Sequence, residues 1–171
     1  ETSLITTIDL SNNKLKSLDQ VKKLVMNQKF LTDLDLSYNE IERIDDDYLF
    51  NTTDFVELSS LNLNDNKINF IRPNSFGSNL LSLIALNLSN NKLSNIDLRE
   101  SGILNLISLK TMDLRGSSIK SLDKSTIVNE LLSLERLLFD GELLCEPNNV
   151  DMMQNICRLN EAEVNRETRR E

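Results

Sequence analysis

The 171-residue chain contains no histidine, four glycines, two prolines and two cysteines. Without histidine it lacks the commonest general base, the usual nitrogen ligand of metals and every serine–histidine or cysteine–histidine catalytic pair. Its few glycines form no phosphate-binding loop, and the acidic run at 45–47 lacks the alternating ligands and the glycine of a calcium loop. We therefore expect a protein that is not an enzyme and holds no cofactor or metal.

Positive charge and long apolar runs are also scarce. The chain has 19 Lys and Arg against 27 Asp and Glu, which gives a net charge of −8. Binding to nucleic acid needs a basic surface, so we do not expect a nucleic-acid partner. No apolar run approaches the roughly 18 residues that a membrane-spanning helix needs. The length fits one domain, and 39% apolar residues suffice for a core.

An internal repeat is the strongest positive signal. The pattern L-x-x-L-x-L-x-x-N-x-L occurs six times, at intervals of 26, 27, 25, 26 and 25 residues, from the starts Ile5, Leu31, Leu58, Leu83, Leu109 and Leu134. Its first, fourth, sixth and eleventh positions are apolar, and we expect them to point inward. One turn cannot bury such a face alone, so neighbouring turns must stack to make a continuous core.

The ninth position of the pattern is asparagine in four repeats: Asn13, Asn39, Asn66 and Asn91. A strand that turns into a loop leaves backbone N–H and C=O groups without partners, and an amide side chain offers both a donor and an acceptor. We therefore expect these residues to form a structural ladder between turns. The position is Ser117 in the fifth repeat and Glu142 in the sixth, so the repeat degrades toward its C-terminal end.

This pattern resembles the leucine-rich repeat superfamily, and in particular its typical extracellular repeats. The resemblance implies an α/β solenoid over residues 1–144, a right-handed superhelix of about six turns with a parallel β-sheet on its concave side. The convex side should be irregular or short-helical, with helices at 21–30, 101–109 and 124–134. Phe50 and Phe76 should fill the core from the irregular segments.

The resemblance also implies a C-terminal cap at residues 145–171. Extracellular members commonly end in a cysteine-containing cap, and Cys145 and Cys157 resemble a reduced version of it with fewer cysteines. A disulfide between them is the prediction, and two free thiols in a cytosolic protein are the alternative. Met152, Ile156 and Leu159 share one face of an expected helix, which would cover the end of the solenoid or begin a contact that forms an oligomer.

The exposed strand positions form the candidate binding face. Position five gives a row in which Asp9, Asp35 and Asp113 predominate, and like charges on neighbouring strands repel unless solvent or a basic partner relieves them. The plainer alternative is that small polar residues only keep the strands soluble. The residues expected to contact a protein partner are Asp9, Asp33, Asp35, Tyr38, Asn62, Asn64, Asp65, Asp113, Arg115 and Arg136.

Two N-x-S/T sequences, at Asn51 and Asn87, are candidate N-glycosylation sites. Together with the resemblance, they favour a non-catalytic protein-binding module of a secreted protein or receptor ectodomain, with a role in innate immunity, ligand recognition or adhesion. An intracellular scaffold or regulatory subunit with reduced cysteines is the alternative. A third possibility is a fragment with no function of its own.

Overall fold

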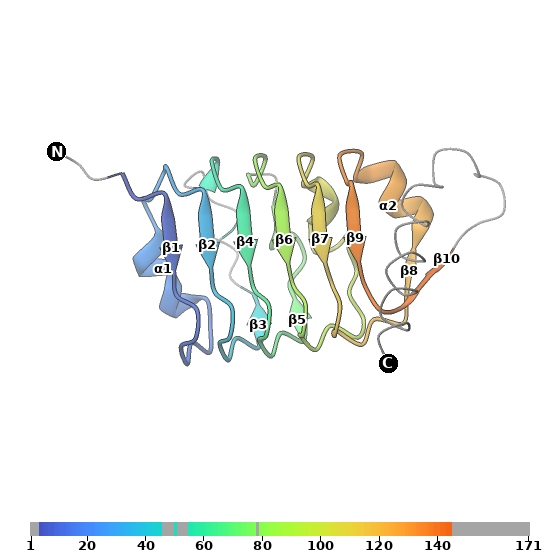
Figure 1. Ribbon diagram of the computed structural model, residues 1–171, viewed down its shortest axis with the longest axis horizontal. Helices are drawn as coiled ribbons and strands as arrows, with labels where there is room; N and C mark the ends of the chain where they lie inside the picture. Colours follow the sequence, from blue (N-terminus) through green and yellow to red (C-terminus); the bar gives the residue numbers. More distant parts are fainter. Residues whose placement is uncertain (1–3, 46–49, 51–54, 78, 145–171) are drawn as a thin grey trace, which may run out of the picture.

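Each repeat places a three-residue strand shortly after its first leucine or isoleucine. The computed structural model describes residues 4–45, 50, 55–77 and 79–144. One parallel sheet contains six of the strands (Figure 1), in the order β1 (Thr7–Asp9), β2 (Asp33–Asp35), β4 (Ser60–Asn62), β6 (Ala85–Asn87), β7 (Thr111–Asp113) and β9 (Arg136–Leu138). Because sequence order and spatial order agree, each turn packs on the turn before it.

Strand pairing keeps equivalent repeat positions side by side. Ile8 pairs with Leu34, Leu34 with Leu61, and the same register continues to Leu137. In the main sheet, the central residue of each strand from β2 to β9 is buried. Its two neighbours are less buried in β2, β4 and β6. The alternation of a strand thus supplies one inward side chain per turn to the core. The fold is an α/β solenoid, as the repeat predicts.

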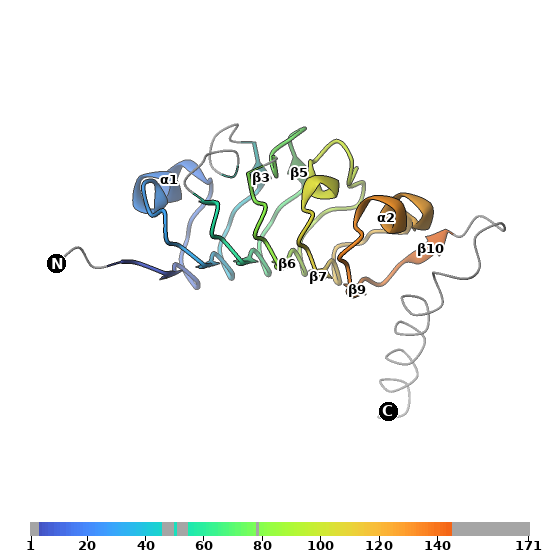
Figure 2. The same cartoon turned by 90° about the horizontal axis from the view of Figure 1, so that it is seen from above.

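Short helices and one two-stranded sheet lie on the side opposite the main sheet (Figure 2), and a second two-stranded sheet lies beyond the last strand of the main sheet (Figure 1). The helices are α1 (Asp19–Val25), the 3₁₀ turn η2 (Ile103–Asn105) and α2 (Lys124–Glu130). The strands pair as β3 (Arg43–Ile44) with β5 (Phe70–Ile71) and as β8 (Ser121–Asp123) with β10 (Glu142–Leu144). The segment expected to be helical at 101–109 forms only η2, which Gly102 precedes in the left-handed conformation at φ 85°.

Phenylalanine side chains fill the core where the chain has no helix. Phe50, Phe55 and Phe76 are each 0% exposed. The rings of Phe50 and Phe76 are stacked, with centroids 5.6 Å apart and an interplanar angle of 7°. This arrangement agrees with the expectation that Phe50 and Phe76 close the core from irregular segments.

The first repeat departs from the expected burial. Ile5 was expected to point inward, yet it is 41% exposed, and Ile8, Leu10 and Leu15 are only partly buried. The equivalent positions in the second repeat are fully or almost fully buried. The cause is stacking, because among the described residues no turn packs on the outer side of β1.

The ninth-position asparagines join successive turns. Asn66 Nδ2 donates to the carbonyl of Leu63 in its own turn (3.2 Å) and to that of Leu36 in the previous turn (3.0 Å), and its Oδ1 accepts from Ile41 N–H (3.0 Å). Asn39 and Asn91 make the equivalent bonds.

The two ends of this column differ from its centre. Asn13 is exposed and donates only to carbonyls of its own turn, those of Leu10 and Ser11 (2.9 Å each). In the fifth turn Ser117 Oγ donates to the carbonyl of Leu88 in the previous turn (3.2 Å).

The sixth turn is shorter than the fifth. Strand β8 begins 12 residues after its repeat start (121−109), whereas its partner β10 begins only 8 residues after its own (142−134). The chain therefore reaches the second sheet four residues earlier, and Glu142 lies in a strand at the position where the first four repeats carry the turn asparagine and the fifth carries Ser117. This shortening accounts for the loss of the sequence pattern there.

Candidate binding surface

The main sheet presents a shallow groove along its outer face. The groove has a volume of about 530 Å³ and is bordered by residues from each of the six strands of the main sheet. Positions three and five of the repeat provide most of its polar groups, among them Asp9, Asp33, Asp35, Asn62 and Asp113. Five of the ten predicted partner-binding residues therefore line one continuous surface.

Position five has a structural role that the sequence analysis did not recognise. Its side-chain oxygen accepts a hydrogen bond from the backbone N–H two residues later in five successive turns. The distances are 2.9 Å at Asp9, 2.8 Å at Asp35, 3.3 Å at Asn62, 3.0 Å at Asn87 and 3.1 Å at Asp113. This is an Asx turn, which ends each strand and starts the following loop. Asp or Asn recurring at that position was the signal available in the sequence.

The Asx turn also affects ionisation at the first strand. Hydrogen bonds from the backbone N–H and the hydroxyl of Ser11 lower the pKa of Asp9 below its ordinary value of 3.8. The neighbouring Asp35 receives a hydrogen bond from Asn62 Nδ2 at 3.1 Å. Asp9 and Asp35 are register partners in β1 and β2, so two carboxylates face the same side of adjacent strands.

Asp113 does not belong to the exposed acidic row that was expected. Asp113 is only 9% exposed. Its carboxylate accepts two hydrogen bonds from the guanidinium of Arg115, Nη2 to Oδ2 (2.7 Å) and Nε to Oδ1 (3.1 Å). Leu138, the register partner of Asp113 in β9, is likewise buried at 8% exposure.

Charge is therefore unevenly distributed along the concave face. Asp9, Asp33 and Asp35 lie together on β1 and β2. Within the described part of the chain, the ion pairs of this face lie at the other end, between Arg115 and Asp113 and between Lys110 and Glu135 (2.9 Å). The N-terminal half of the face is consequently acidic.

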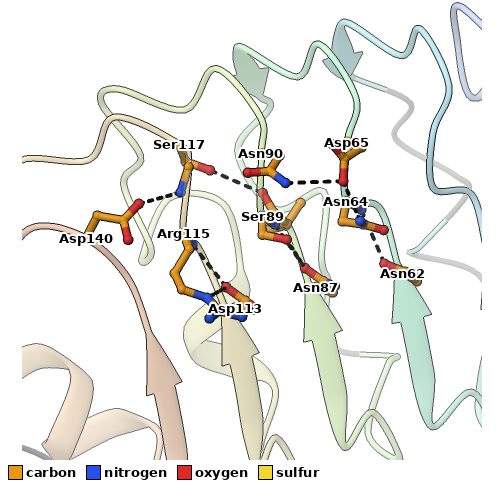
Figure 3. A network of polar contacts seen from close by, with 12 residues as sticks. Asn62, Asn64, Asp65, Asn87, Ser89, Asn90, Asp113, Arg115, Ser117 and Asp140 are labelled. Carbon is orange, nitrogen blue, oxygen red and sulfur yellow. Dashed lines mark hydrogen bonds and ion pairs between the residues drawn. The ribbon is translucent and has the colours of Figure 1, made fainter. Parts of the chain in front are cut away.

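A polar edge adjoins the groove where the strands end (Figure 3). Asp65 Oδ2 accepts from Asn64 Nδ2 (2.6 Å) and from Asn90 Nδ2 of the next turn (3.2 Å). Farther along, the backbone N–H of Gly116 donates to the carboxylate of Asp140. The predicted residues Asn64 and Asp65 thus lie on this edge rather than in the groove. The side chain of Asp65 connects two neighbouring turns, and that of Asn64 donates to Asp65 within its own turn.

The eighth repeat position on this edge adopts the left-handed backbone conformation in five turns. The φ angles are 56° at Asn12, 54° at Tyr38, 51° at Asp65, 53° at Asn90 and 66° at Gly116. Asn, Asp and Gly tolerate this region, whereas a tyrosine there is uncommon. Tyr38, three residues after the end of β2, is 54% exposed, so little packing of its side chain offsets this backbone conformation.

The remaining predicted sites are placed as follows. Arg136 lies exposed in β9. Asn87 lies within β6, and its Oδ1 accepts from Ser89 Oγ, the hydroxyl of its own glycosylation sequence, at 2.7 Å. Asn51, Cys145, Cys157 and the expected C-terminal helix fall outside the described residues. In the described part of the chain, no helix is long and apolar enough to cross a membrane.

Comparisons with known proteins agree with the repeat. A family model described as Leucine Rich Repeat matches residues 57–79. Over 134 residues the chain is 38% identical to leucine-rich repeat-containing G-protein coupled receptor 5 of Rattus norvegicus. That alignment covers 77% of this chain and 13% of the receptor, so the chain spans about one eighth of that relative's length.

Two solved structures share the fold. An internalin, inlF of Listeria monocytogenes, is 20% identical with a TM-score of 0.51, covering 81% of this chain and 43% of its own. TLR13, solved in complex with ssRNA13, is 22% identical with a TM-score of 0.59, covering 88% of this chain and 25% of its own. At these identities the two structures support the architecture alone.

Proposed function

This chain is a leucine-rich repeat protein, and we propose that it is a non-catalytic module that binds a protein partner through the N-terminal half of its concave face. The proposed contact residues are Asp9, Asp33 and Asp35 on the first two strands and Tyr38 on the adjoining edge. Asn62, Asn64, Asp65, Arg115 and Arg136 extend the surface along later turns.

The observation that carries this proposal is the backbone conformation of Tyr38. A non-glycine residue in the left-handed region costs of order 1 kcal/mol, and such residues concentrate at functional sites. The four equivalent positions hold Asn, Asp or Gly, which adopt this conformation more easily. Tyrosine is also favoured in the centres of protein interfaces. An exposed tyrosine at a position that suits asparagine is therefore best explained by binding.

The charge of the surface supports a partner with a basic face. Three carboxylates lie beside Tyr38 on two adjacent strands, and complementary charge speeds encounter and excludes acidic competitors. Screening by salt weakens interactions between exposed charges, so binding should decrease as ionic strength rises.

We further propose an extracellular setting, as part of a secreted protein or receptor ectodomain. The matching relative is a receptor, and Cys145 and Cys157 follow the last repeat. Roles in innate immunity, ligand recognition or adhesion are consistent with such a module. The alternative function is an intracellular scaffold, in which Cys145 and Cys157 would be free thiols.

Thiol labelling and intact mass distinguish these settings. Protein from its native source should accept an alkylating reagent at Cys145 and Cys157 only after reduction, and should carry glycan mass at Asn51 or Asn87. Immediate labelling of both cysteines on a chain without glycan would favour the intracellular alternative.

Affinity capture with variant baits tests the binding face. The wild-type chain, Asp35→Lys and Tyr38→Ala would be immobilised, and retained proteins quantified by mass spectrometry. Glu100→Lys is the matched charge control, and Leu24→Ala, 54% exposed like Tyr38, is the matched apolar control on α1. We expect a partner lost from the two concave variants and kept by both controls. A partner kept equally by all five baits would refute the proposed face.

A further inference from the structure

Four consecutive strands of the main sheet are preceded by a tight turn of the same form. In each, the N–H of the fourth residue donates to the carbonyl of the first: Leu58 to Phe55 (3.0 Å), Leu83 to Leu80 (3.2 Å), Leu109 to Leu106 (3.0 Å) and Leu134 to Leu131 (3.0 Å). These first and fourth residues are buried in the core. The two residues between them form the tip of the turn, outside the core.

The first tip residue is apolar and exposed in all four turns. Exposure is 40% at Val56, 48% at Leu81, 59% at Ile107 and 79% at Leu132. Ile84, at the start of β6 beside these tips, is 43% exposed. The narrow turns before β4, β6, β7 and β9 lie side by side along one edge of the sheet (Figure 1). The four tip residues hold the same position in successive turns, two residues before each repeat start, and together with Ile84 they make up one apolar row. We call it the turn ridge.

Local structure does not require apolar residues at these tips. Turn tips favour Pro, Gly, Asn, Asp and Ser, which stabilise the bend or interact with water. The second tip residues follow that rule as Ser82, Ser108 and Ser133, and the equivalent turn before β2 carries Lys29 at its first tip position. Single exposed apolar residues need no explanation, but a contiguous set marks an interaction surface.

We infer that the turn ridge is a self-association surface, on which a second copy of this chain packs in antiparallel orientation. The tips repeat at the spacing of neighbouring strands, about 4.8 Å. A second ridge has the same spacing and stays in register along its whole length. A partner helix, whose turns repeat every 5.4 Å, would drift by about 2 Å over three intervals. A two-fold axis between the Leu81 and Ile107 turns pairs Val56 with Leu132 of the other copy.

Charge at the two ends of the ridge fits this orientation. At the Val56 end, the turn tips and strand starts of the second and third repeats carry the charged residues Lys29, Asp33 and Glu57, with a net charge of −1 (+1−1−1). At the Leu132 end, the turn tips and strand starts of the fifth and sixth repeats carry Lys110, Glu135 and Arg136, with a net charge of +1 (+1−1+1). An antiparallel pair brings unlike ends together at both sides, whereas a parallel pair would oppose like charges.

The dimer expected from this surface is weak. Stable interfaces bury about 800 Å² on each partner, and a ridge of five side chains supplies only the apolar centre of such an area. The overall charge of −8 adds repulsion between copies. Association through the ridge leaves both concave faces open and side by side, so it goes beyond the proposed binding function without competing with it.

Sedimentation equilibrium of the full chain under reducing conditions tests the inference, from about 1 µM to about 1 mM, the range of weak association. We expect a concentration-dependent monomer–dimer equilibrium. The double variant Leu81→Lys with Ile107→Lys should raise the dissociation constant at least about tenfold, because it places like charges at the centre of the contact. Leu24→Lys, an equally exposed apolar residue on α1, should leave it unchanged.

A charge exchange examines the orientation separately. Glu57→Lys should weaken the dimer, and combining it with Lys110→Glu should restore most of the loss. A chain that stays monomeric to about 1 mM, or a double variant that dimerises like the wild type, would overturn the inference. If the wild type is monomeric and the ridge variants instead lose the partner captured by the concave face, the ridge belongs to that partner's site.

Discussion

Replacing Tyr38 with asparagine should stabilise the fold while weakening binding. Tyr38 has φ 54°, and asparagine occupies this conformation at Asn12 and Asn90 without difficulty. The side chain of Tyr38 is more than half exposed, so little apolar contact is lost. Its backbone N–H bond to the carbonyl of Asn64 (3.0 Å) does not depend on the side chain. Relief of the left-handed strain should therefore dominate, with a gain of about 0.5–1 kcal/mol in the free energy of unfolding.

Urea unfolding followed by circular dichroism measures this gain as a shift of the midpoint at constant slope. The reverse change, Asn90→Tyr, is the control, because it introduces the strain and removes the 3.2 Å bond to Asp65. It should cost about 1–2 kcal/mol. A loss of stability in Tyr38→Asn, or full retention of the captured partner by that variant, would refute the argument that strain is kept at this position for binding.

Two further predictions concern the turns themselves. Asn66→Ala should cost about 1–3 kcal/mol, because it leaves the buried N–H of Ile41 without its acceptor. It also removes one of two side-chain donors at the carbonyls of Leu36 and Leu63, which keep their bonds from Asn39 and Asn91. The exposed Asn13→Ala should cost under about 1 kcal/mol, and equal losses in urea unfolding would contradict the proposed ladder. The hydrogen bond and charge of Lys67 lower the pKa of Glu40 below its ordinary value of 4.5. Its ionised form therefore stabilises the fold above pH 4.5, and this contribution is lost as pH falls through the lower folded pKa. NMR titration of the Glu40 carboxyl should show that lower pKa in the wild type and its return toward 4.5 in Lys67→Met.

The architecture could be predicted because every repeat places apolar residues at the same positions. Leu34, Leu61 and Leu86 occupy one column, and a register error of one residue would expose all of them. At the first repeat, the same pattern predicts burial that the structure does not show. Ile5 fits the pattern but is exposed, because burial in a solenoid comes from the neighbouring turn and not from the residue's own repeat.

The binding face was harder to predict, since a repeat position fixes the direction of a side chain but not its partners. Asp113 and Asp35 hold the same position, yet Arg115 neutralises Asp113 while Asp35 accepts a hydrogen bond from Asn62. Similarly, the sequence predicts Tyr38 as a contact residue, but a single tyrosine gives no indication that its backbone is left-handed. The column of Asn, Asp and Gly at the eighth position was the available signal.

Site-specific photo-cross-linking tests the central claim, that a protein binds the concave face, most directly. A photoreactive residue would be placed at Asn62, in the middle of the groove, or at Leu24 on α1, and each chain would be irradiated with the partner identified by capture. The account predicts cross-links from position 62, reduced by high salt and absent in the Asp35→Lys background. Cross-links that form from position 24 and not from position 62 would contradict it.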